Sequence, residues 1–245
     1  MGIYPIALPR YMSLHDRDQS QQPNLEQITE QLQSNNAKDR VLAMLDLQKE
    51  VMPTAQALPL IKQALNDSNE QVKAIAIFSL GIKPDPSNLD ILTQILISDP
   101  DYNMRAIAAG ALGYLEDDRA LEPLRHAFYE DHSWLVQFSA AVALGNLKNT
   151  RAEAVLIEAL QSKQELLQEA AIAALGEIGS ISAVDYLLPF ATAKDWTIRK
   201  RLAEALGNLP TAKSKEALQM LEQDENKFVA QAAKLAQQQL NDLLN

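Results

Sequence analysis

Aromatic side chains gather in the middle of this sequence, together with two of its three histidines. The 37 residues from Tyr102 to Phe138 hold six of the 13 aromatic residues, and His126 and His132 lie among them. Aromatic rings offer large contact areas, and those of Tyr and Trp add a polar tip, so they hold planar ligands and helices of partner proteins well. The window therefore predicts a binding surface.

Seven residues from this window and its flank form the candidate binding set. Tyr102 and Trp134 stand 32 residues apart; for them and for Trp196, filling the turns between helices is the more usual role, and contact with a partner is the alternative. Phe78 and Phe138 lie off the apolar stripe of their predicted helices, so we expect them to be exposed. The set is Phe78, Tyr102, Arg105, Tyr129, His132, Trp134 and Phe138.

The histidines and carboxylates of residues 126–132 are the best candidates for metal binding or proton transfer. The spacing from His126 to His132 matches no common ligand pattern, so a solvated turn is the favoured interpretation. The chain has no cysteine, no glycine-rich phosphate loop, and no GxSxG or HExxH motif. The sequence thus predicts neither a metal site nor a catalytic residue, and an enzyme with a self-contained active site is not expected.

Composition narrows the partners and the location. The net charge of −10 disfavours nucleic acid, and no apolar run approaches the roughly 18 residues that span a bilayer. Residues 1–24 are rich in Gln and Pro and carry no secretory signal, so we expect a mobile tail. The expected location is the cytoplasm.

A repeat organises the rest of the chain. Five triplets of the form SLG or ALG end at glycines spaced 32, 32, 31 and 31 residues apart, and each closes a segment with one apolar stripe of helical period. A polar residue three positions before each stripe predicts an N-cap, and the glycine predicts a left-handed C′ residue. The glycines are Gly81, Gly113, Gly145, Gly176 and Gly207; the predicted N-caps are Asn69, Asp101, Ser133, Gln164, Asp195 and Asn226, of which Gln164 is the poorest.

A second predicted helix precedes each of these segments; one of them is Ala183–Phe190. The chain is rich in helix formers and poor in strand formers. About seven helical hairpins over residues 25–245 must stack to bury their apolar faces. The predicted fold is an all-α solenoid with a period of 31–32 residues.

Charged residues recur with the repeat. Lys73, Arg105 and Arg199 stand one position into their helices, and an Asp precedes several helices in the turn. We expect a structural role, with ion pairs within each unit that join the stack. Gln137 replaces the cation beside Asp131, which either leaves this Asp free or reflects drift.

The repeat resembles a known family. The units DPDYNMRAIAAGALGYLEDDRALEPL (Asp99–Leu124) and DHSWLVQFSAAVALGNLKNTRAEAVL (Asp131–Leu156) carry an acidic turn, an aromatic residue before the helix, and an A-L-G close. The first also has a basic residue one position into the stripe. In these features, over most of residues 54–210, the chain is similar to HEAT-like repeats of the phycobilisome-lyase type.

The resemblance implies a function that composition and periodicity do not. Within the family, the single compact array is most similar to the branch of phycobilisome degradation proteins such as NblB, which implies a cyanobacterial or plastid host. It implies a non-catalytic protein that engages phycobiliproteins or their bilins, with no tightly bound cofactor and transient phycocyanobilin as a ligand. The alternatives are a subunit of an E/F-type bilin lyase, with Tyr129 or His132 as an acid–base residue, and a generic protein-interaction scaffold.

Overall fold

The computed structural model describes residues 24–244, and in this range it consists of helices and short 3-10 turns without a strand. The all-α helical-repeat prediction is confirmed. The predicted tail lies outside the described residues except for Asn24, whose side chain caps the first helix by accepting the Gln27 N–H at 2.9 Å. The chain divides into two compact units, whose described parts are residues 24–120 and 121–244. Each unit is described by itself, and one array over residues 25–245 stays a prediction.

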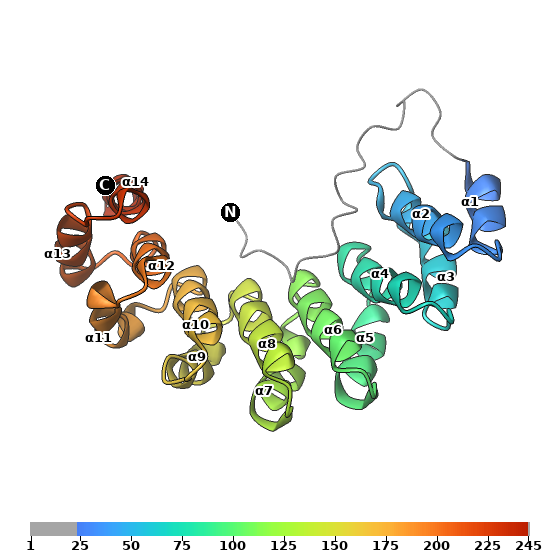
Figure 1. Cartoon of the computed structure of the whole chain (residues 1–245), viewed down its shortest axis with the longest axis horizontal. Helices are drawn as coiled ribbons and strands as arrows, with labels where there is room; N and C mark the ends of the chain where they lie inside the picture. The colour runs from blue at the N-terminus through green and yellow to red at the C-terminus, as the bar shows by residue number, and fades with distance from the viewer. Residues whose placement is uncertain (1–23, 245) are drawn as a thin grey trace. The chain divides into compact units, whose positions relative to one another are not determined.

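The N-terminal unit is built from three helical hairpins among the described residues (Figure 1). The second helix of each hairpin packs against the second helix of the next, so α2, α4 and α6 form one layer. The elements are α1 (Leu25–Leu32), α2 (Ala37–Gln48), α3 (Thr54–Ala64), α4 (Glu70–Ile82), α5 (Asn88–Ser98), α6 (Tyr102–Tyr114) and the 3-10 turn η2 (Asp118–Ala120).

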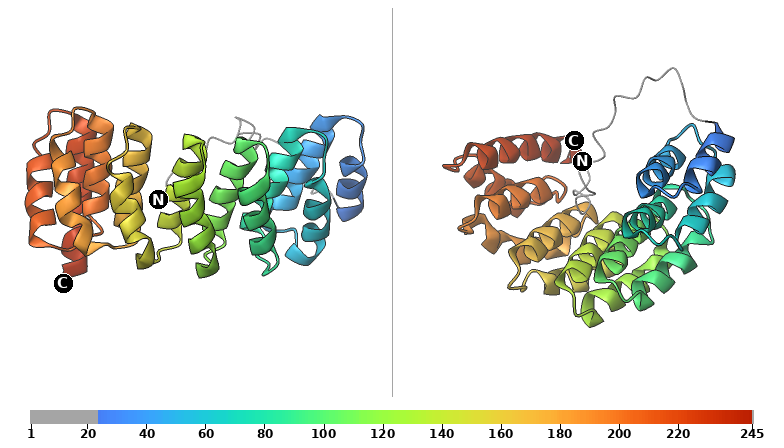
Figure 2. Two further views of the ribbon diagram at one scale, coloured as in Figure 1. Left: turned by 90° about the horizontal axis from the view of Figure 1, so that it is seen from below. Right: turned by 45° about the vertical axis from the view of Figure 1, so that its right-hand side comes forward.

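The C-terminal unit has four hairpins in its described part, and α8, α10, α12 and α14 pack side by side (Figures 1 and 2). The elements are α7 (Leu121–Glu130), α8 (Trp134–Asn146), η3 (Thr150–Ala152), α9 (Glu153–Ala159), α10 (Glu165–Glu177), η4 (Ile181–Ala183), α11 (Val184–Leu187), η5 (Leu188–Thr192), α12 (Trp196–Leu206), α13 (Ala212–Leu221) and α14 (Lys227–Leu244).

One predicted helix is broken. The segment Ala183–Phe190 divides into a four-residue α-helix and the 3-10 turn η5. Pro189 lies inside it, and a proline has no N–H to donate to the preceding turn. The prediction of one regular helix here was wrong.

The repeat glycines serve close packing rather than helix ending. A Cβ added at Gly145, Gly176 or Gly207 would lie 2.7–2.9 Å from the nearest atom of an alanine. That alanine belongs to the second helix of the following hairpin. Gly207 has a φ of −61°, and the left-handed residues are Glu116, Lys148 and Gly179. The prediction of left-handed C′ glycines was therefore wrong: the missing side chain lets neighbouring backbones touch.

Ion pairs do join the stack, but the expectation that they form within one hairpin was wrong for Asp67 and Arg199, because each pairs with a residue of a neighbouring hairpin. Arg199 donates to Asp224 in a bidentate pair at 2.7 and 2.9 Å, and Arg40 makes the same pair with Asp67. All four side chains are at most 14% exposed. Within its own hairpin, Arg199 donates to a backbone carbonyl, that of Ala193, at 2.7 Å.

Candidate functional site

The most conspicuous surface feature of the C-terminal unit is a row of large apolar side chains at the starts of its second helices. We call these four residues the ladder. Each belongs to α8, α10, α12 or α14 in turn, and each is between 39% and 53% exposed. The ladder consists of Trp134, Leu166, Trp196 and Phe228.

Position along the helix explains the exposure. The ladder residues stand at the first or second position of their helices, one or two residues before the buried stripe begins. That stripe opens at Val136, Leu167, Ile198 and Val229, each at most 5% exposed. A side chain in the first turn precedes the packed part of its helix, so it stays partly exposed.

Residues in the preceding turns cap these helices and fix where each one begins. The Asp195 carboxylate accepts the Thr197 N–H at 2.8 Å, and the Asn226 side chain accepts the Phe228 N–H at 2.9 Å. Ser133 and Gln164 occupy the N-cap positions of α8 and α10 without a side-chain cap bond. The predicted N-cap positions are thus confirmed, although only some of them use their side chains.

The ladder has defined local geometry at its C-terminal end. The rings of Trp196 and Phe228 lie with centroids 5.6 Å apart and planes tilted by 32°, and the Lys227 ammonium stands 5.2 Å from the Phe228 centroid. Among the described residues, neither the Trp134 nor the Trp196 indole N–H has a hydrogen-bond acceptor. The surface therefore offers apolar area together with two unused donors.

The structure places three of the seven predicted binding residues in the N-terminal unit. Tyr102, at the start of α6, is 49% exposed. Phe78 is only partly exposed and meets Tyr114 edge-on at 5.6 Å. Arg105 donates to the carbonyl of Asp99 at 2.9 Å, which closes the turn before its helix. The exposure expected for Phe78 is thus reduced by its ring contact.

The other four belong to the C-terminal unit. Tyr129 is the penultimate residue of α7 and donates its hydroxyl to the Glu158 carboxylate at 2.9 Å. Partial burial and this bond raise the pKa of Tyr129 above its usual value. His132 lies exposed in the following turn, Trp134 begins α8, and Phe138 is partly exposed one turn further on. Tyr129, His132 and Trp134 thus lie at or beside one turn of the chain.

Two expectations about these residues need correction. Burial of Tyr102, Trp134 and Trp196 in the turns was the favoured interpretation, but all three are exposed. Asp131 is not free, because its carboxylate accepts the Ser133 N–H at 2.8 Å and Gln137 donates to its carbonyl at 3.0 Å. Within the described chain, no three His, Asp or Glu side chains converge as a metal ion would require.

Sequence reasoning missed Leu166 and Phe228 as surface residues. Both occupy the repeat position beside Trp134 and Trp196, displaced by one residue. A search for apolar residues one or two positions before each stripe would have found them.

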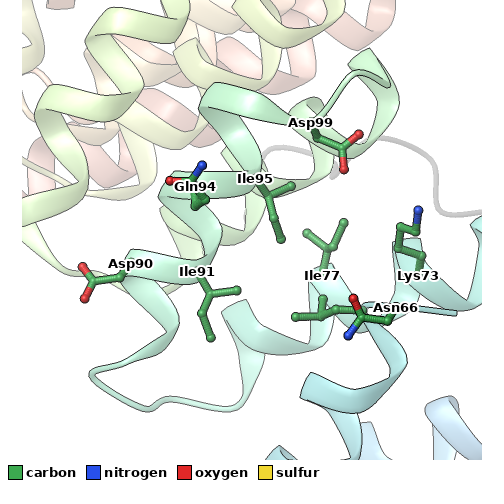
Figure 3. A pocket seen from close by; sticks show the side chains of 9 residues that line it. Asn66, Lys73, Ile77, Asp90, Ile91, Gln94, Ile95 and Asp99 are labelled. Atoms are coloured by element: carbon green, nitrogen blue, oxygen red, sulfur yellow. The ribbon is translucent and has the colours of Figure 1, made fainter.

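A cavity of about 600 Å³ lies in the N-terminal unit, beside α3, α4 and α5. Figure 3 shows Ile77, Ile91 and Ile95 along its wall, with Lys73 and Asp99 nearby. Its lining thus mixes apolar side chains with polar ones, which include Asn66, Asp90 and Gln94. No helix in the described part of the chain is long and apolar enough to cross a membrane.

The comparisons with known proteins agree with this architecture. The family model of HEAT repeats matches residues 89–173 and 153–237, together more than half of the chain. No curated protein matches the sequence.

Solved structures share the fold at low identity. The complex of CpcE and CpcF of phycocyanin lyase from Nostoc sp. PCC7120 is 19% identical with a TM-score of 0.59, over 91% of this chain and 97% of that one. The E. coli protein YibA is 21% identical with a TM-score of 0.57, over 87% of this chain and 81% of that one. An engineered protein is 20% identical with a TM-score of 0.56, over 88% of this chain and 68% of that one. At such identities the likeness shows the fold alone.

Proposed function

The chain belongs to the HEAT-repeat family, and we propose that it is a non-catalytic binding protein that engages a phycobiliprotein or its bilin. In this role it would assist the degradation or remodelling of phycobilisomes, as NblB-like proteins do. Stacked helical repeats present extended surfaces that bind other proteins. The fold likeness to a phycocyanin lyase complex supports the choice of partner.

The ladder is the observation that carries the binding role. Four large apolar side chains, each at least 39% exposed, begin four helices that pack in sequence. Contiguous exposed apolar surface on a folded protein marks an interaction site more often than chance. The rings of Trp134 and Trp196 suit both a flat chromophore and a protein surface.

Charge adds a constraint on the partner. This chain carries a net charge of −10, so a phycobiliprotein, which is typically acidic, is repelled at long range. Apolar contacts must then supply the affinity. Binding is expected to tighten as salt rises toward about 0.15 M, where the Debye length is roughly 8 Å.

Co-elution with holo-phycocyanin tests the proposal. The purified chain is mixed with holo-phycocyanin, and absorbance and fluorescence are recorded across a sizing column. We expect co-elution with a spectral change for the wild type, and loss of both for the double variant Trp134→Ser, Trp196→Ser. Tyr186→Ser is the matched control, because Tyr186 is 53% exposed on α11 and lies off the ladder. If the wild type neither co-elutes nor changes the spectrum, a generic scaffold becomes the better proposal.

The likeness to CpcE and CpcF favours a second candidate, a subunit of an E/F-type bilin lyase. In that case Tyr129, hydrogen-bonded to Glu158, would serve as an acid–base residue while a thioether forms or breaks at a substrate cysteine. The assay mixes apo-phycocyanin and phycocyanobilin with the chain, alone and with a second repeat subunit. Bilin transfer that Tyr129→Phe abolishes would support a lyase; binding without transfer would retain the non-catalytic role.

A further inference from the structure

We propose that the cavity of the N-terminal unit binds the guanidinium group of an arginine from outside this chain, which pairs with Asp99. The cavity measures about 600 Å³ and lies beside α3, α4 and α5. The inference goes beyond the proposed function and does not depend on it, because the ladder belongs to the other unit.

The ion pairs between hairpins show how this fold holds a guanidinium. In each, the Arg is the fourth residue of a second helix, and the Asp lies in the turn between the two helices of the following hairpin. Arg40 donates to both carboxylate oxygens of Asp67, at 2.7 and 2.8 Å. Arg199 donates to both oxygens of Asp224, at 2.7 and 2.9 Å. The same arrangement thus recurs in the two units.

Lys73 and Asp99 occupy the equivalent positions one hairpin after Arg40 and Asp67. Lys73 is the fourth residue of α4, and Asp99 lies in the turn between α5 and α6. In the part of the chain that the structure describes, however, the Lys73 ammonium donates no hydrogen bond and forms no ion pair. The bidentate pair found at Asp67 is therefore missing at Asp99.

The Asp99 carboxylate is nevertheless held in the same way as its counterparts. Its Oδ1 accepts the Asp101 N–H at 2.9 Å. In Asp67 and Asp224, the same atom accepts the N–H two residues ahead, at 2.8 and 2.9 Å. Among residues 24–244, the Oδ2 of Asp99 has no donor. The turn thus orients this carboxylate for a guanidinium that these residues do not supply.

The cavity lies where the missing pair would be. Lys73 and Asp99 both line it, and Figure 3 shows Ile77 and Ile95 beside them. A guanidinium at Asp99 would bring its alkyl stem close to these isoleucines, and such stems pack well on apolar surface. The volume falls within the roughly 300–1,000 Å³ that is typical of ligand pockets. The cavity can therefore hold an arginine together with apolar neighbours.

The charges in the cavity favour a guanidinium over other ions. The charged groups among the described residues that line it are the carboxylates of Asp90 and Asp99 and the ammonium of Lys73, so a cation is favoured over an anion. An ammonium already lies in the lining without pairing with Asp99, whereas both arginines at equivalent positions pair with their aspartates. A guanidinium offers two parallel donors to a carboxylate, whereas an ammonium is a single point charge.

Peptide titration provides the test. We would titrate the capped peptide Gly-Leu-Arg-Leu-Gly and the same peptide with Lys in place of Arg, and follow the backbone amide signals of Asp99 and Asp101 by NMR. The Arg peptide is expected to shift these signals and to bind at least about tenfold more tightly than the Lys peptide. Equal affinity for the two peptides, or no shift at millimolar concentrations, would overturn the proposal.

Free L-arginine distinguishes the two sources of the guanidinium. The leucines of the peptide can bury apolar area against the isoleucines of the cavity, so we expect the peptide to bind more tightly than free L-arginine. That result assigns the site to an arginine side chain of a protein. Tighter binding of free L-arginine assigns it to the amino acid, and both results support a guanidinium site.

Asp99→Asn isolates the carboxylate. An asparagine oxygen can still accept the Asp101 N–H, so the turn is kept while the charge is removed. This variant is expected to weaken the Arg peptide at least about tenfold. Glu70→Gln is the matched control, because Glu70 is exposed at the start of α4 and does not line the cavity. Unchanged affinity in folded Asp99→Asn contradicts the inference; circular dichroism melting checks the fold.

Lys73→Arg tests the equivalence directly. The new guanidinium is expected to pair with Asp99, to raise the melting temperature and to weaken the Arg peptide at least about tenfold. Lys73→Met is the matched control, since it removes the ammonium without supplying a guanidinium and should keep the binding. Wild-type affinity in Lys73→Arg would overturn the proposal. Co-elution with phycocyanin should be the same in this variant as in the wild type, so the failure of either proposal is recognised separately.

Discussion

The two units share one architecture but differ at the edge where their second helices begin. In the C-terminal unit, α8, α10, α12 and α14 each begin with a large exposed apolar side chain. In the N-terminal unit, α2 begins with Ala37 and Lys38, α4 begins with Glu70 and Gln71, and only α6 begins with an aromatic residue, Tyr102. The buried stripe specifies the fold in both units. The positions just before it are free to specialise.

The interiors differ as well. The N-terminal unit buries Lys83, whose ammonium donates to the carbonyls of Lys49 and Met52, each at 2.7 Å. It also buries Asn88, which donates to the carbonyls of Leu80 and Lys83. These bonds satisfy backbone carbonyls at helix ends and in connections, which have no helical N–H as a partner. The C-terminal unit also buries a cation, Arg199, but pairs it with the Asp224 carboxylate as well as with a backbone carbonyl.

The largest expected effect tests whether the inter-hairpin ion pairs are equivalent in the two units. Arg40→Met and Arg199→Met each strand a carboxylate that is at most 12% exposed, and each is expected to lower the free energy of unfolding by about 3 kcal/mol. Urea unfolding measures the loss. Arg125→Met is the control, since its pair with Glu122 is exposed and is worth under about 1 kcal/mol. A small effect in only one unit would break the equivalence.

The same pairs predict an acid-sensitive stability. Hydrogen bonds from Arg40 and Arg199 hold the pKa values of Asp67 and Asp224 below their ordinary value of 3.8. A lowered pKa in the folded state contributes stability above the ordinary value, and this contribution is lost as the pH falls through the folded-state value. Urea unfolding from pH 5 to about pH 2 should show the loss, and Arg199→Met should flatten it. An unchanged slope in that variant would mean that other carboxylates dominate.

Glycine substitutions should act alike in both units. Gly81→Ala and Gly176→Ala place a Cβ 2.7 Å from backbone atoms of Ala111 and Ala205, respectively. Overpacking of this kind costs about 1–3 kcal/mol, so we expect each variant to melt at a lower temperature. Gly110→Ala is the matched control: its Cβ would meet nothing within 4 Å in the middle of α6, and it should stabilise by about 0.5–1 kcal/mol. A neutral Gly176→Ala would show that the helices can separate without loss.

A mutant cycle sharpens the account of the ladder. Trp196→Ala and Phe228→Ala remove rings whose centroids lie 5.6 Å apart, and their coupling in unfolding free energy is expected to be about 0.5–1 kcal/mol. Trp134→Ala with Phe228→Ala should be additive, because these residues belong to helices that are not neighbours. Additivity in the first pair would mean that the contact between the two rings adds nothing to the free energy of unfolding.

The smallest effects concern stability at the helix starts. Tyr102→Ser in one unit and Leu166→Ser in the other should each change the free energy of unfolding by less than about 0.5 kcal/mol, because both side chains are about half exposed. Thermal melting measures this. A large stability loss in Leu166→Ser would assign the ladder to folding rather than to binding.

The sequence predicts the helices well because their signals are local. Apolar period, N-caps such as Asp101, and the 31–32 residue spacing all act within a few turns of chain. Predictions fail where a residue in a local pattern makes its main contact with a residue in another hairpin. Gly176 has the sequence context of a C-cap, yet it is needed for contact with Ala205 in the next hairpin. Arg199 pairs 25 residues ahead, with Asp224, which spacing within one hairpin does not reveal.

The sequence predicted only part of the candidate site, because residue type is easier to recognise than position relative to the buried stripe. Trp134 stands out in sequence as an aromatic residue, but Leu166 is one leucine among many. Only its place before the buried Leu167, together with the equivalent places of Trp196 and Phe228, marks it as a surface residue. Residue type alone does not carry this information, whereas register relative to the stripe does.

The contacts between glycine and alanine also fix the distance between neighbouring helices of the C-terminal unit. At Gly145, Gly176 and Gly207, backbone meets backbone across neighbouring helices. No flexible side chain separates the two backbones at these glycines, so a change of side-chain rotamer cannot alter the distance between the helices. The spacing of α8, α10, α12 and α14 is therefore set by backbone contact, and a side chain added at any of the three glycines would have to widen it.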